Sequence, residues 1–143
     1  MEIEYNLELI SLNGLENLTS ISNALRIVEN WKLETLNSLN SLNDIDVQFF
    51  LSNNHLLTNL NGLESLRQVP QIIILNNVNL ISINGLEGIT SSSNIGIVSN
   101  DSLNNFCSLV QFVQANSQTV QFSARFNSYN PSLDDLINNN CSN

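Results

Sequence analysis

Apolar side chains recur at every third position along most of this chain, in blocks that each follow an asparagine. In the first block, the apolar positions are Leu9, Leu12, Leu15, Leu18 and Ile21. The blocks begin at Asn6, Asn30, Asn54, Asn77 and Asn100, at intervals of 24, 24, 23 and 23 residues. A period of three fits neither an α-helix nor a strand, but it suits 3₁₀ or polyproline-like turns. We therefore expect a bent path with its leucines on one side.

Each block ends in two apolar residues separated by one outward position, shortly before the next asparagine. These pairs are Leu25 and Ile27, Phe49 and Leu51, Ile72 and Ile74, and Ile95 and Ile97. Short alternation rich in β-branched residues predicts a half-buried strand. One such coil cannot bury its own apolar side, so stacked coils with parallel strands ~4.8 Å apart are expected. The pattern predicts a mainly β fold, a parallel β-solenoid of about five coils.

Two columns of asparagine mark the bends of these coils. The first follows each strand by three residues, where buried amides can satisfy backbone groups that the bend leaves unpaired. We predict a structural hydrogen-bonded ladder of Asn6, Asn30, Asn54, Asn77 and Asn100. The second column opens the motif "NGLE" at residues 13, 61 and 84, with the variant "NSLN" at residue 37. Asn-Gly favours a turn, the leucine fills the core, and the glutamate is expected to form a solvated edge.

The two ends of the chain differ. We assign residues 1–105 to the coils and 106–143 to a C-terminal cap, within a single domain. The cap sequence predicts a short amphipathic helix around Phe112, a last strand through Phe122 and a second short helix containing Asp134. The first coil has no such cover, and an open edge invites association. We expect a neighbouring domain, self-association, or an upstream part of a longer protein there, and favour the last.

The chain has two cysteines, Cys107 and Cys141, and neither lies in a zinc-ligand spacing. A free buried pair is one possibility; a disulfide that pins the cap, and that indicates an oxidising compartment, is favoured. The N-terminus has neither the basic nor the apolar region of a signal peptide. We expect a secreted or cell-surface protein from which an export signal has been removed, with a cytosolic location as the alternative.

Composition and charge narrow the possible partners. Asn, Leu and Ser make up nearly half of the chain, and charged residues are only 12%, against roughly 25% in an average soluble protein. The net charge is −9, from 13 acidic and 4 basic residues. So few cations argue against nucleic-acid binding, and an anionic membrane surface would repel the chain. No apolar run approaches the ~18 residues of a membrane span, so no membrane insertion is expected.

Candidate chemistry is sparse. The only histidine, His55, follows a ladder asparagine, and the corresponding residues of other coils have no common chemistry. A surface histidine is a simpler interpretation than a catalytic base, and no nucleophile, phosphate-loop or metalloprotease motif accompanies it. Asp134 and Asp135 at a helix start are expected to complement the helix dipole. We predict that the protein is not an enzyme and uses no cofactor and no metal.

The outward positions of the strands carry the best candidate for function. Because side chains alternate across a strand, an apolar patch is expected on the face opposite the core. The predicted interaction face comprises Arg26, Val28, Phe50, Ile73, Leu75 and Val98. We expect a recognition or adhesion module that binds a protein or a glycan there. The alternative is a structural solenoid that orders water or ice through a polar column, formed by Ser11, Thr35, Asn59 and Ser82.

Longer stretches resemble a known family. "LRIVENWKLETLNSLNSL" and "IIILNNVNLISINGLEGI" resemble leucine-rich repeats and, more closely, the receptor L-domain family. The end, from "FCSL" to "YNPSLDDLINNNC", is similar to the caps of secreted or surface proteins of Bacteroidetes-type bacteria. The resemblance implies a right-handed parallel β-solenoid of 23–24-residue coils with a small helical C-terminal cap, a disulfide, export, and binding rather than catalysis. Ser92 in a core position and the missing N-terminal cap depart from the family pattern.

Overall fold

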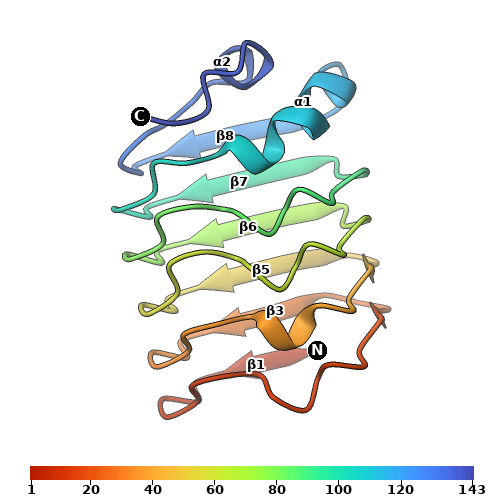
Figure 1. Cartoon of the computed structure of the whole chain (residues 1–143), viewed down its shortest axis with the longest axis vertical. Coiled ribbons are helices and arrows are strands. Elements are labelled where there is room, and N and C mark those ends of the chain that lie inside the picture. Colours follow the sequence, from red (N-terminus) through yellow and green to blue (C-terminus); the bar gives the residue numbers. More distant parts are fainter.

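The computed structural model describes residues 1–143, and its main element is one large parallel sheet (Figure 1). Each strand pairs with the strand of the next repeat, so the order in the sheet follows the chain. The strands are β1 (Glu2–Glu4), β3 (Leu25–Val28), β5 (Gln48–Ser52), β6 (Gln71–Leu75), β7 (Asn94–Val98) and β8 (Gln121–Arg125). The predicted mainly β fold with parallel strands is confirmed. The sheet stays open, with β1 and β8 at its two edges.

The predicted alternation within the strands sets the core side of the sheet. Ile27 lies opposite Leu51 and Leu51 opposite Ile74, which gives offsets of 24 and 23 residues between neighbouring strands. Each inward side chain therefore stacks on its counterpart in the next repeat. The fully buried inward residues are Leu25, Ile27, Phe49, Leu51, Ile72, Ile74, Ile95 and Ile97. Their columns form the sheet's half of the hydrophobic core.

The return path of each coil crosses the inner face of the sheet and supplies the other half of the core (Figure 1). On this side, β2 (Ser20–Ile21) pairs in parallel with β4 (Asp44–Ile45), and single bridges continue the ladder to Gln68 and Ser91. The apolar residues of the second return path are all buried: Leu33, Leu36, Leu39, Leu42 and Ile45. In the first coil, which has a neighbour on one side only, three remain partly exposed: Leu9, Leu15 and Leu18.

A ladder of asparagines joins the coils directly after the strands. Asn54 Nδ2 donates to the carbonyl oxygens of Ile27 (2.9 Å) and Ser52 (3.0 Å). Asn54 Oδ1 accepts from the backbone N–H of Asn30 at 3.1 Å. The ladder consists of Asn6, Asn30, Asn54, Asn77, Asn100 and Asn127. Its four interior members, from Asn30 to Asn100, are completely buried, so each bend keeps its backbone groups paired without water.

The "NGLE" corners owe their glycine to a close approach between coils. Gly62 has φ +107°, and a Cβ at this position would lie 2.2 Å from the carbonyl oxygen of Leu36 in the preceding coil. Glu64 is more than the solvated edge expected from the sequence, because its carboxylate accepts from the Gly62 N–H at 2.9 Å. Glu16 and Glu87 bond Gly14 and Gly85 in the same way. Only the glycine of each Asn-Gly pair has positive φ.

Two corners carry serine in place of glycine and form a 3₁₀ turn instead. These turns are η1 (Asn37–Leu39) and η2 (Cys107–Leu109). Ser38 Oγ donates to Oδ1 of Asn13 at 3.1 Å, and Ser108 Oγ donates to Oδ1 of Asn84 at 3.2 Å. The sequence "CSLV" at 107–110 is therefore a fifth version of the corner, in register with the four recognised from the sequence.

The C-terminal end of the stack is covered by the chain itself (Figure 1). The predicted first helix is α1 (Val110–Asn116), which buries Phe112 and Val113. The second predicted helix is α2 (Leu133–Ile137). A disulfide joins Cys107 to Cys141, whose Cα atoms are 4.8 Å apart. The predicted disulfide is confirmed. The segment assigned to the cap also contributes β8 to the sheet, in parallel register with β7.

Candidate interaction surface

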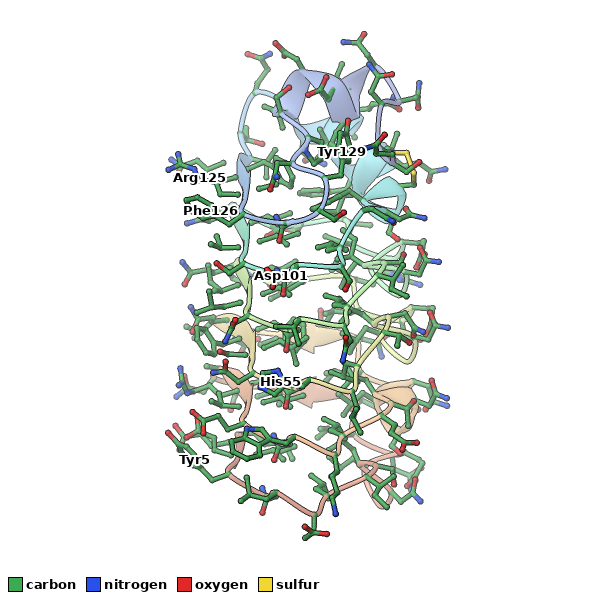
Figure 2. The ribbon with its side chains drawn as sticks, turned by 90° about the vertical axis from the view of Figure 1, so that its left-hand side faces the viewer. Tyr5, His55, Asp101, Arg125, Phe126 and Tyr129 are labelled. Carbon is green, nitrogen blue, oxygen red and sulfur yellow. A yellow bond between two sulfur atoms is a disulfide. The ribbon has the colours of Figure 1, made fainter.

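The outer face of the sheet carries the residues for which interaction was predicted. Both helices lie at the C-terminal end of the stack, and side chains alone project from this face, at the left of Figure 2. The register places Arg26, Phe50, Ile73 and Gly96 in one column. The adjoining column contains Val28, Ser52, Leu75 and Val98. Val28 and Ser52 are buried, whereas the other six residues are half-buried.

Side chains on this face hold one another in place. The Arg26 guanidinium lies 4.6 Å from the centre of the Phe50 ring, a cation–π contact. Arg26 Nε also donates to the Glu4 carboxylate at 2.9 Å. Further along the column, Cδ1 of Ile73 occupies the space over Gly96, where a Cβ would lie 3.2 Å away. The apolar strip therefore continues across the glycine.

A column of amide side chains runs beside the apolar strip and was not predicted. It consists of Gln48, Gln71, Asn94 and Gln121, each at the start of its strand. Nε2 of Gln48 donates to Oε1 of Gln71 at 2.6 Å. Amides offer both donors and acceptors to a ligand. The column could have been found from the sequence, because each amide residue immediately precedes the first inward residue of a strand.

The turns after the strands form a second exposed edge, which faces the viewer in Figure 2. The residue before each ladder asparagine adopts a left-handed conformation, with φ between 54° and 59°. These residues form a column: Tyr5, Glu29, Asn53, Asn76, Ser99 and Phe126. Its two aromatic members are among the most exposed apolar side chains of the molecule, at 63% for Tyr5 and 75% for Phe126. Neither tyrosine nor phenylalanine favours positive φ, so the conformation of these two residues does not follow from their type.

His55 lies on this turn edge, directly after the ladder residue Asn54. Its ring centroid is 6.3 Å from that of the exposed Trp31, with the two planes tilted by 34°. The His55 Nδ1 atom is buried and has no hydrogen-bond partner. The backbone carbonyl of His55 accepts from the Asn79 side chain at 2.7 Å, which fixes the turn. Asp101, two coils further along, occupies the equivalent position (Figure 2).

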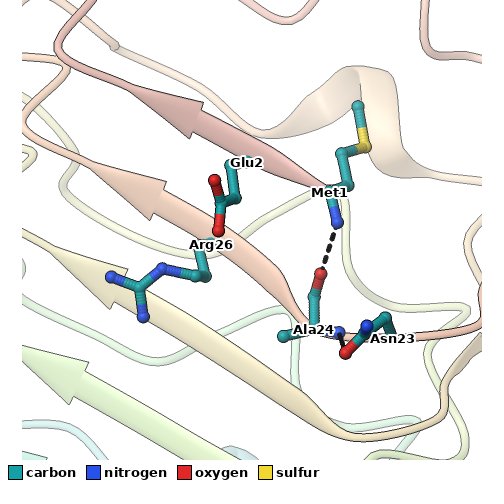
Figure 3. Close-up of a pocket in the computed structure, with 5 residues that line it drawn as sticks. All are labelled: Met1, Glu2, Asn23, Ala24 and Arg26. Atoms are coloured by element: carbon teal, nitrogen blue, oxygen red, sulfur yellow. Dashed lines mark hydrogen bonds between the residues drawn. The ribbon is translucent and has the colours of Figure 1, made fainter.

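A small hollow lies at the start of β1 and β3. It has a volume of about 340 Å³ and is lined by Met1, Glu2, Asn23, Ala24 and Arg26. Figure 3 shows the Met1 ammonium group donating to the carbonyl oxygen of Ala24, at 2.6 Å. The lining thus combines one carboxylate, one guanidinium and the Met1 ammonium group with the side chains of Asn23 and Ala24.

Three of the four residues in the polar column proposed to order water, Thr35, Asn59 and Ser82, accept hydrogen bonds from the backbone. Thr35 Oγ1 accepts from the Asn37 N–H at 3.1 Å, and Asn59 Oδ1 accepts from the Asn61 N–H at 3.0 Å. Ser82 Oγ accepts from the Asn84 N–H at 3.0 Å. These oxygens therefore stabilise the corners. The structure contains no group of three or more histidine, cysteine or acidic side chains arranged to hold a metal ion.

The helices are short, and none has the length and apolar character to cross a membrane. No protein-family model matches the chain, and comparisons with curated proteins and with solved structures give no match.

Proposed function

We propose that this protein is a non-catalytic recognition or adhesion module that binds a protein or a glycan through the outer face of its parallel sheet. The observation that carries the proposal is the uncovered strip of Phe50, Ile73, Leu75 and Val98, flanked by the amide column. Ordered apolar strips with polar margins are typical of interaction sites. At ~4.8 Å per strand, the six strands offer a surface about 24 Å long.

The architecture that we propose for this module is a right-handed parallel β-solenoid of the receptor L-domain and leucine-rich-repeat kind. Its support is that every repeat adds one strand to the same sheet at offsets of 23 or 24 residues between β1 and β7. A repeat architecture suits recognition, because the columns that form the core are fixed while the outward columns are free to vary.

We place the module outside the cytosol, secreted or at a cell surface. The support for this location is the disulfide between Cys107 and Cys141, because disulfides persist mainly in oxidising compartments. The bridge ties the C-terminal segment to the last corner, so it also protects the covered end of the stack.

Phe50 and Arg26 form the proposed centre of the contact. The Phe50 ring is fixed by the guanidinium above it, so little side-chain freedom remains to be lost on binding. Aromatic and arginine side chains dominate the binding energy of many interfaces. A carboxylate in place of Phe50 removes the ring and introduces a charge that any apolar ligand group would have to desolvate.

The test uses an array of purified glycans and matrix glycoproteins, probed with the intact chain and three variants. Phe50→Asp and Ile73→Asp alter half-buried residues of the outer face, and Ile81→Asp alters a more exposed isoleucine on the return path, as a control for introducing a charge elsewhere on the surface. We expect a ligand bound by the unmodified chain and by Ile81→Asp but lost, by at least about 100-fold in affinity, in the other two. Circular dichroism checks that all variants fold. Retained binding in both outer-face variants would exclude this face.

A further inference from the structure

The Asn-Gly pairs of the three "NGLE" corners combine an exposed amide with an unhindered backbone nitrogen. Asn13, Asn61 and Asn84 are all exposed, so water reaches their side chains. Each is followed by a glycine, which has no Cβ to hinder an approach to the preceding side chain. Asn-Gly is for this reason the dipeptide in which the backbone nitrogen most readily displaces ammonia from the asparagine amide. Whether a corner reacts therefore depends on what holds its amide and its nitrogen.

The reaction is a deamidation through a cyclic imide, with water as the only co-reactant. The backbone nitrogen of the glycine loses its proton to solvent and attacks Cγ of the asparagine. A C–N bond forms, the Cγ–Nδ2 bond breaks, and Nδ2 leaves as ammonia after taking up a proton. Water then opens the ring at either carbonyl, which gives aspartate or isoaspartate, in which the main chain passes through Cγ. The rate rises with the fraction of the glycine amide that is deprotonated.

The glutamate of each corner opposes the first step of this reaction. Glu64 accepts from the Gly62 N–H at 2.9 Å, and Glu87 accepts from the Gly85 N–H at 2.8 Å. These charge-assisted bonds hold the proton that must leave. The carboxylate also lies beside the nitrogen that would become negative, and a neighbouring like charge disfavours an anion. The glutamates are thus expected to slow deamidation in both of these interior corners.

The two interior corners differ in what holds the asparagine amide. Oδ1 of Asn84 accepts from Ser108 Oγ, in the next coil, at 3.2 Å. The residue that occupies the place of Ser108 beside Asn61 is Gly85, which has no hydroxyl. The Asn61 side chain accordingly has no hydrogen-bond partner within the protein, and only its backbone N–H is bonded to a side chain. The Asn61 amide is therefore free to rotate toward the Gly62 nitrogen.

We propose that Asn61 is a site of spontaneous deamidation in the folded protein, which reacts faster than Asn84 and is slowed by the Glu64 carboxylate. The product adds a negative charge beside Glu64 and, as isoaspartate, one more atom to the main chain. This lengthening falls at the corner where Gly62 packs closely against the Leu36 carbonyl, so the modified coil cannot keep the same contact. The reaction needs no ligand, so its tests are independent of the outer face.

The first test compares the two interior corners in the intact chain. The chain is held at mildly alkaline pH, and peptide mapping by mass spectrometry measures aspartate and isoaspartate at both positions over time. We expect Asn61 to be converted about 5-fold faster than Asn84, the factor expected for the loss of one hydrogen bond. Ser108→Ala should raise the conversion of Asn84 toward that of Asn61. Equal conversion of the two residues in the unmodified chain would overturn the proposal, and so would an unchanged Asn84 in Ser108→Ala.

A second variant tests the carboxylate. Glu64→Gln keeps the size of the side chain and removes its charge, so conversion of Asn61 should rise by on the order of 10-fold while that of Asn84 stays the same. Hydrogen exchange of the Gly62 amide should accelerate with it, because exchange removes the same proton. The Leu63 amide, which bonds a backbone carbonyl of the same corner, is the control for a loosened corner. Unchanged conversion of Asn61, or equal acceleration of exchange at Leu63, would overturn the proposed role of the carboxylate.

Discussion

The two ends of this molecule are built from the same coil but finished in different ways. At the C-terminal end, Asn127 completes the ladder, and Asn130 takes the place of a further coil by accepting from both the backbone and the side chain of Asn127. In the first coil, the ladder residue Asn6 is exposed and is bonded to one neighbouring coil, through Asn30. Equivalent residues of different coils are therefore expected to contribute differently to the free energy of unfolding. The contribution depends on whether the residue is hydrogen-bonded to coils on both sides.

The covered end also shows how much chain is needed to close such a stack. Phe106 packs edge-on against both Phe122 and Tyr129, which joins the last coil, the last strand and the loop before α2. The backbone N–H of Phe106 donates to the Cys141 carbonyl at 2.8 Å. Aromatic packing, a disulfide and a capped helix thus take over the roles that one more coil would have.

The largest predicted effect concerns the ladder. Asn54→Ala leaves the carbonyls of Ile27 and Ser52 and the N–H of Asn30 buried with fewer partners, so we expect a loss of about 4–6 kcal/mol in unfolding free energy. Asn6→Ala, at the open end, should cost less than about 1 kcal/mol because water replaces the amide. Urea unfolding measures both. Equal losses would show that burial does not set the weight of a ladder position.

The disulfide gives the next largest effect. Its two cysteines are 34 residues apart, and releasing a loop of that length is expected to cost about 3–4 kcal/mol. The double replacement Cys107→Ser with Cys141→Ser should lower the unfolding free energy by this amount. Hydrogen exchange should accelerate in α2 while the amides of β3 and β5 keep their protection. Faster exchange throughout the sheet would contradict a role confined to the covered end.

Gly62→Ala and Gly14→Ala form a matched pair with the same chemistry and nearly the same φ. In the interior, the added Cβ must displace the Leu36 backbone, and we expect a loss of about 3 kcal/mol or more. At the open end, only the strain of positive φ remains, at about 1–2 kcal/mol. Urea unfolding of both variants gives the difference. A Gly14→Ala loss as large as that of Gly62→Ala would mean that the N-terminal end is already occupied.

Much of the fold could be predicted from the sequence, because it follows from periodicity. The spacing of three and the alternating pairs identified the strands and the buried face, as with Ile27 and Leu51, and the two cysteines gave the bridge. The positive φ of Tyr5 and Phe126 could not be predicted, since neither residue favours it and the turn is imposed by the stacking of coils.

For the candidate surface, the sequence predicted which residues point outward from the strands, but not how their side chains pack against one another. Alternation placed Phe50 and Ile73 outward. The stacking of Arg26 on Phe50 and the burial of Val28 depend on side-chain conformations that no spacing encodes. The role of Glu64 was missed for a similar reason. A carboxylate next to a turn is expected to face solvent, and only the structure shows that the Gly62 N–H points toward it.

The smallest predicted effect is on the pH dependence of stability, and it concerns one carboxylate at each end of the molecule. The Gly14 N–H lies 3.0 Å from both oxygens of Glu16, and this bond lowers the pKa of Glu16. At the covered end, the Ser132 hydroxyl and then its N–H lower the pKa of Asp135, which caps α2. A pKa lowered in the folded state gives stability that is present above the ordinary pKa and lost as pH falls through the folded value.

Glu16→Gln and Asp135→Asn should therefore each be slightly less stable than the unmodified chain at neutral pH, and both deficits should shrink as the solution is acidified. Urea unfolding at a series of pH values measures the deficits, and NMR titration of the Gly14 amide follows Glu16 directly. The Glu16 deficit should be the smaller, since Asp135 completes a reciprocal capping box with Ser132 whereas Glu16 bonds one amide. A Glu16→Gln deficit that is independent of pH would mean that shape rather than charge matters at the open corner.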